Sequence, residues 1–99
     1  MFLELAHTKL DVFQITKNFV LACYKETKSF PSEEKFGITS QIRRAALSVH
    51  LNVAEGCSRK SLAERKRFYE IARGSLIEVD AALDIAMDLG YTLKQKLEN

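Results

Sequence analysis

The spacing of apolar residues along the chain is helical throughout, and no segment shows the alternation expected of a strand. The clearest helix lies between Gln41 and Arg59. With 100° per residue, one apolar stripe on it comprises Ile42, Ala45, Ala46, Val49 and Val53. A second stripe, roughly 120–180° away, comprises Leu47, Leu51 and Ala54. Because one stripe is enough to dock a helix on a core, two stripes predict a helix packed between neighbours, inside a bundle or across a subunit boundary.

A first helix is expected from about Thr8 to Lys28. Pro31 ends this segment, because proline disfavours helical backbone at the residue before it. The expected core face of this helix comprises Val12, Ile15, Thr16, Phe19, Ala22 and Cys23, widened by Phe13, Val20 and Tyr24. After a short turn broken at Gly37, the second helix is expected from about Thr39, with Gly56 as the residue that follows its end.

A third helix has a clear start, because Ser61 and Glu64 form a capping box. Its expected core stripe comprises Phe68, Ala72, Ser75, Leu76, Val79, Leu83 and Ala86, and Gly90 is its expected stop. A second capping box over residues 92–95 predicts a fourth helix with room for about two turns before Asn99. The predicted fold is all-α, a single domain over residues 1–99, built as an up-and-down four-helix bundle with a short or truncated fourth helix.

Composition places the chain among soluble globular proteins, with 46% hydrophobic and 28% charged residues. No apolar run approaches the ~20 residues that a membrane span needs, and the N-terminus lacks the pattern of a signal peptide. Two cysteines far apart in sequence, Cys23 and Cys57, favour reduced thiols. A cytoplasmic protein without membrane contact is therefore expected.

The net charge of +2 hides a strong asymmetry. Residues 1–42 are neutral overall, residues 43–73 carry eight basic and three acidic groups (+5), and residues 74–99 carry two basic and five acidic groups (−3). Charge segregated in this way orients a polyanion or steers self-assembly.

Six cations of the basic region are expected to form what we call the basic ridge. Its members are Arg59, Lys60, Arg65, Lys66, Arg67 and Arg73. Such a ridge would meet phosphates by charge, with an affinity that falls as salt rises. Tyr69 is the one aromatic residue well placed at its edge for base stacking. The alternative is an ordinary solvated helix face, with Glu64 and Glu70 as local partners.

Other chemistry has little support in the sequence. A di-iron bundle needs two Glu-x-x-His motifs, and only Glu4-Leu5-Ala6-His7 fits, so neither a metal nor a cofactor is expected. Cys57 lies near cations that favour a lower pKa, but no histidine is close in sequence to serve as its base. Four residues are expected to be structural: Arg43, Asn52, Glu55 and Arg73. The two arginines are expected to hold carboxylates, with Glu55 and Glu78 as candidates, and Asn52 to satisfy a backbone group. Gly74 and Ser75 are expected to let a neighbouring helix approach closely.

The segments QIRRAALSVHLNVAEGCSRKS and IARGSLIEV resemble the 23S ribosomal RNA intervening sequence proteins, a bacterial family of four-helix bundles. The resemblance extends from about Leu10 to Leu93 and implies a ring-like homopentamer whose biochemical role is unassigned. Accessory proteins of diversity-generating retroelements look related and point to nucleic-acid binding. The family's signature positions are occupied by Arg44, Asn52, Glu55, Gly56, Arg59, Gly74 and Ser75. His50 stands where the family usually has proline, and the chain stops where the family's fourth helix has barely begun.

Together these observations predict a non-enzymatic homo-oligomer that binds nucleic acid, RNA before DNA, through the basic ridge and without reading bases. Five copies of a +5 region would bring +25 to one band. The oligomer interface is expected at Leu47, Leu51 and Ala54. The main alternative is a structural scaffold that binds another protein and has no nucleic-acid ligand.

Overall fold

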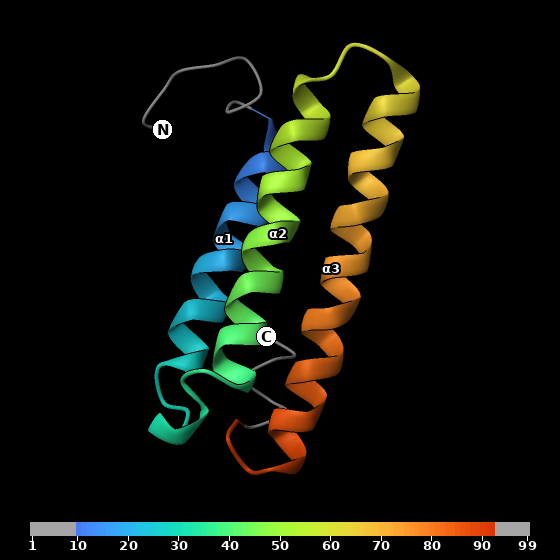
Figure 1. Ribbon diagram of the computed structural model, residues 1–99. Coiled ribbons are helices and arrows are strands. Elements are labelled where there is room, and N and C mark those ends of the chain that lie inside the picture. The colour runs from blue at the N-terminus through green and yellow to red at the C-terminus, as the bar shows by residue number, and fades with distance from the viewer. Residues whose placement is uncertain (1–9, 93–99) are drawn as a thin grey trace.

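The computed structural model describes residues 10–92 of the chain. Within that range it contains three α-helices, α1 (Asp11–Thr27), α2 (Ile38–Ser58) and α3 (Leu62–Asp88), with one turn of 3₁₀ helix, η2 (Ser32–Glu34), and no strand (Figure 1). The all-α prediction is therefore confirmed. None of these helices is both long and apolar enough to cross a bilayer. The predicted fourth helix falls almost entirely on residues 93–99, outside the described residues.

The three helices run up and down, and α2 lies between α1 and α3 (Figure 1). Both outer helices pack on α2, whereas α1 and α3 make little contact with each other. The turn between α2 and α3 is short, so the two helices form a continuous antiparallel hairpin. This hairpin carries the basic ridge.

The core follows the main apolar stripe of α2. All five of its predicted members are buried, and Ile42 and Ala46 are fully enclosed. On α3 the residues that meet this stripe recur every seven positions, at Ala72, Val79 and Ala86. Because alanine is small, the two helices pack closely, and larger side chains such as Ile42 and Val79 fill the space between them. Full burial of one such side chain stabilises the fold by about 1.5–3 kcal/mol.

The predicted core faces of α1 and α3 need correction. The buried face of α1 comprises Phe13, Thr16, Val20, Cys23 and Thr27. Val12 and Ile15, expected in the core, are 44% and 65% exposed, and Leu76 on α3 is 45% exposed. The reason is that each outer helix packs mainly on α2, so only the side facing α2 is covered within residues 10–92.

The helix ends follow the sequence signals with one exception. Ser61 Oγ accepts a hydrogen bond from the Glu64 backbone N–H at 3.1 Å, so the predicted start of α3 is confirmed. Gly90, two residues after the end of α3, has a φ of +80°, and the helix stops there as predicted. The prediction that Gly56 ends α2 is wrong: α2 continues to Ser58, and Gly56 is buried inside it. A Cβ atom at this position would lie 2.6 Å from Cε1 of Tyr69, so glycine serves close packing here.

Candidate nucleic-acid interface

The turn between α2 and α3 is held by Arg59. Its guanidinium Nη2 donates to the Glu55 carboxylate at 2.9 Å, and its Nε lies 3.9 Å from Glu64 Oε2. The same guanidinium lies 4.9 Å from the centre of the Phe68 ring. Arg59 therefore joins the last turns of α2 to the first turns of α3. Each pair is partly exposed and contributes about 0–1 kcal/mol, so its effect is to orient the turn.

A second arginine, Arg65, also contacts the turn between α2 and α3. Arg65 Nε donates to the Arg59 carbonyl oxygen at 2.6 Å, which satisfies a backbone acceptor just beyond the end of α2. This bond uses one of the guanidinium's five N–H donors, so the others stay available to an external anion. Within the basic ridge, Arg59 and Arg65 thus shape the turn from which the rest of the ridge extends.

The other four cations of the basic ridge are Lys60, Lys66, Arg67 and Arg73, and all are exposed. In the part of the chain that the structure describes, none of the four has a carboxylate within ion-pair distance. Of the local partners expected for an ordinary solvated face, Glu64 approaches Arg59, whereas Glu70 makes no ion pair among residues 10–92. The expected pairing of Arg73 with a carboxylate such as Glu55 or Glu78 is not made within that range either. Unpaired cations leave a positive field that draws phosphates.

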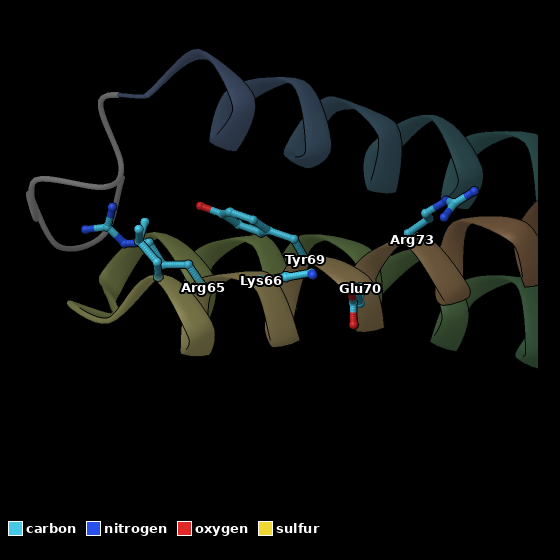
Figure 2. Close-up of a pocket in the computed structure, with 6 residues that line it drawn as sticks. Arg65, Lys66, Tyr69, Glu70 and Arg73 are labelled. Carbon is cyan, nitrogen blue, oxygen red and sulfur yellow. The ribbon is translucent and has the colours of Figure 1, made fainter.

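Part of the ridge surrounds an open hollow on α3. Its lining comprises Leu62, Arg65, Lys66, Tyr69, Glu70 and Arg73. Figure 2 shows the Tyr69 ring between Arg65 and Arg73, which lie one helical turn before and after it. Three ridge cations, Arg59, Lys60 and Arg67, do not line this hollow, so the structure brings the other three of the six to one place.

The Tyr69 ring is fixed by α2. The ring packs on Gly56, and its hydroxyl lies 3.5 Å from Cys57 Sγ. The hydrogen bond with Cys57, followed by burial, raises the pKa of Tyr69, while Arg65 opposes the rise. Tyr69 is therefore a neutral phenol at pH 7. The contact between Gly56 and Tyr69 could not be read from the sequence, because it joins two helices at a register that periodicity does not determine.

Two of the residues predicted to be structural, Arg43 and Asn52, make polar contacts, the first with α1 and the second within α2. Arg43 Nε donates to Thr27 Oγ1 at 2.8 Å, and its guanidinium lies 4.8 Å from the centre of the Tyr24 ring. The expected carboxylate partner of Arg43 was wrong, since a hydroxyl and a ring on α1 take that place. Asn52 Nδ2 donates to the Ser48 carbonyl oxygen at 2.9 Å, as predicted for a backbone partner.

The two signature positions on α3, Gly74 and Ser75, differ in whether they contact α2. Ser75 Oγ lies 2.8 Å from Ser48 Oγ, so this small residue links α3 to α2. Gly74 is exposed, and a Cβ built there meets nothing within 4 Å among the described residues. The close approach expected at Gly74 is therefore not made by the described part of this chain. Arg44 is exposed as well.

The residues expected at an oligomer interface are uncovered. Leu47 and Leu51 are 39% and 52% exposed, and Ala54 is partly buried. The second apolar stripe of α2 thus faces away from the core of residues 10–92. No group of three or more potential metal ligands occurs among the described residues.

Comparison with known families agrees with the sequence motifs. The model of the 23S rRNA-intervening sequence protein family matches residues 8–99. The chain belongs to this family. No curated protein matches it. Within the family, the signature positions of this chain thus serve distinct purposes: Arg59, Glu55 and Gly56 build the turn and seat Tyr69, Ser75 joins α3 to α2, and Asn52 bonds within α2.

Proposed function

We propose that the protein is a non-enzymatic RNA-binding module that contacts phosphates through the basic ridge. The observation that carries the proposal is the set of four exposed ridge cations, Lys60, Lys66, Arg67 and Arg73, which have no ion-pair partner among the described residues. The ridge lies in a region of net charge +5, whereas residues 74–99 carry −3. Charge concentrated in one region of a molecule binds a polyanion more strongly than the same net charge spread evenly.

Two further considerations favour RNA. The family that the chain belongs to is named for an intervening sequence of 23S rRNA. Lysine and arginine side chains on an exposed helix contact backbone phosphates without reading the bases, which suits a ligand recognised by charge and shape. The predicted affinity is therefore largely independent of sequence and strongly dependent on salt.

The test is fluorescence-anisotropy binding of a structured RNA and a single-stranded RNA over a salt series. The double change Lys66→Ala with Arg67→Ala removes two exposed ridge cations, and alanine maintains the helix. The matched control, Lys25→Ala with Lys28→Ala, removes the same charge from exposed positions near the end of α1. We expect only the ridge variant to bind more weakly, with the salt slope for single strands reduced by about 0.7 for each lost phosphate contact.

Absence of RNA binding by the folded wild-type protein at low salt would contradict the proposal. Equal losses in the ridge and control variants would also contradict it, since they would show that net charge alone matters.

A second candidate, a homo-oligomeric scaffold, is favoured by the exposed stripe of Leu47 and Leu51 on α2. We propose that this stripe, with Ala54, is the interface of a homo-oligomer, and the family resemblance implies a pentamer. Leu47→Asp or Leu51→Asp is expected to lower the mass in solution while the monomer stays helical. Monomeric wild-type protein at micromolar concentration would refute the assembly. If the scaffold function is the correct one, the ridge double variant changes oligomer mass and no RNA is bound.

A further inference from the structure

The hollow on α3 contains one aromatic ring among three cations. Arg65, Tyr69 and Arg73 follow one another at intervals of four residues and span about 12 Å of the helix axis. Lys66 lines the same hollow. The one acidic residue of the lining, Glu70, points its carboxylate away from the side on which Tyr69 and Arg73 rise (Figure 2). The hollow thus offers a ring with positive charge before and after it.

The Tyr69 ring packs on α2 along one side and is otherwise partly exposed. Its Cδ1 and Cε1 atoms pack on Gly56, where even a Cβ atom would come within 2.9 and 2.6 Å of them. The hydroxyl is anchored by Cys57 at 3.5 Å. Even so, Tyr69 remains 42% exposed. A ring that is already held in one orientation loses little conformational entropy when a planar group stacks on it. This arrangement therefore favours stacking.

We propose that Tyr69 is a stacking platform for an unpaired base of a single-stranded nucleic acid, whose flanking phosphates bind Arg65, Lys66 and Arg73. This inference rests on the proposed function and narrows its ligand from RNA in general to single strands. In a duplex the faces of the bases are covered by their neighbours, whereas a single strand presents them to aromatic side chains. An acidic peptide would satisfy the cations but has no planar base to lay on the ring.

The stacking is independent of sequence, since every base has a π-face. The two contributions are also separable. The cations set the salt dependence of binding, and the ring adds affinity that salt does not remove.

The experiment compares three probes: decauridylate, an abasic ribose-phosphate decamer with the same charge, and a ten-base-pair RNA duplex. Wild-type protein is expected to bind decauridylate roughly 5- to 150-fold more tightly than the abasic decamer. Tyr69→Leu should erase that preference and leave the salt slope unchanged, while Tyr69→Phe, which retains the ring, should keep it. The control is Tyr24→Leu, at another exposed tyrosine, which should also keep it.

Each outcome bears on a different claim. A folded Tyr69→Leu protein that still prefers decauridylate over the abasic decamer overturns the stacking site but leaves phosphate binding intact. Failure of the wild type to bind any of the three probes overturns the proposed function itself. Binding of polyglutamate as tightly as decauridylate overturns the inference in favour of an acidic protein partner.

A second measurement covers the case in which Tyr69→Leu unfolds. The chain has three tyrosines and no tryptophan, so Tyr24→Phe with Tyr91→Phe leaves Tyr69 as the sole fluorophore. Saturating decauridylate should quench its emission more than the abasic decamer does. Equal emission with the two probes would overturn the proposal.

Discussion

The two sides of α2 make their helix–helix contacts with different kinds of residue. Toward α3, α2 presents small residues, including Gly56 and Ser48, which allow close packing and a direct polar link. Toward α1, the contact combines a large buried ring with longer polar side chains. The Phe13 ring lies 4.5 Å from the ring of His50, and Arg43 reaches Thr27 and the Tyr24 ring. The α2–α3 contact positions the basic ridge, and the α1–α2 contact holds α1 on the bundle.

This difference means that one contact mainly determines the position of the helices, while the other mainly contributes to the free energy of unfolding. Small residues stabilise little by themselves, yet they determine how near two helices come and therefore where Tyr69 and the ridge lie. A large ring buries much apolar area at one point, so its removal costs much free energy without moving the ridge. Variants on the α1 side should therefore affect folding, and variants on the α3 side should affect binding.

The largest effect is expected for Phe13→Ala. Phe13 is 3% exposed, and the loss of a buried phenylalanine ring lowers the free energy of unfolding by about 3–5 kcal/mol. Urea unfolding followed by circular dichroism measures this change, and the folded fraction should still bind RNA. The control is Val12→Ala in the same turn, which should cost much less because Val12 is 44% exposed. Equal losses for the two variants would mean that Phe13 is not the main anchor of α1.

Acid should weaken the α1–α2 contact through His50. Burial, with a smaller contribution from the charge of Lys17, lowers the pKa of His50 below its ordinary value of 6.5. The folded protein thus binds a proton less readily than the unfolded chain does, and stability falls as pH drops from 6.5 through the lower folded pKa. One proton gives a slope of at most about 1.4 kcal/mol per pH unit.

Urea titrations between pH 7.5 and 5.5 test this slope. His50→Gln should flatten the dependence, although it also alters the hydrogen bond between the His50 ring and Thr16 Oγ1, which are 2.8 Å apart. His7→Gln, at the other histidine, provides the control. An unchanged slope in His50→Gln would assign the acid sensitivity elsewhere.

A smaller effect is expected for the hydroxyl pair between α2 and α3. Ser75→Ala breaks one hydrogen bond at 2.8 Å and should cost about 0.5–1.5 kcal/mol. Ser48→Ala should cost somewhat more, because Ser48 Oγ also accepts a hydrogen bond from Asn52 Nδ2 at 3.1 Å. The double variant should cost less than the sum, because no hydroxyl is left without its partner. A double-mutant cycle from melting curves measures the coupling, and strict additivity would show that the bond contributes nothing.

The smallest change in stability, but a clear loss of binding, is expected for Gly56→Ala. The added Cβ would displace Tyr69, whose partly exposed ring can swing outward, while alanine favours the helix by about 0.8–1 kcal/mol over glycine. We expect the free energy of unfolding to stay within about 1 kcal/mol of wild type and the preference for decauridylate over the abasic decamer to fall. A retained preference would mean that the position of Tyr69 does not depend on Gly56.

The sequence predicts the buried face of the central helix α2 better than the faces of α1 and α3 or the partners of polar residues. Periodicity identified every buried residue of the α2 stripe, and capping chemistry located the start of α3 at Ser61. It missed the partner of Arg43, because Thr27 is 16 residues away and the pairing depends on the register of α1 against α2. For the candidate site, charge clustering found the ridge cations. The sequence did not predict the contact between Tyr69 and Gly56, because a glycine near a helix end is usually interpreted as a helix terminator.

The order of charges along α3 runs against its own backbone dipole. Helices are stabilised by acids at their first turn and bases at their last. In α3, Lys60 precedes the start and Arg65 follows one turn in, with Glu64 as the single acid of the first turn, while the last turn has Asp88 and no base. The free protein is therefore less stable than a rearranged sequence of the same composition would be. Stability and binding are thus opposed in α3. Moving the basic residues to the end of α3 and the acidic residues to its start should raise the melting temperature and remove affinity for polyanions.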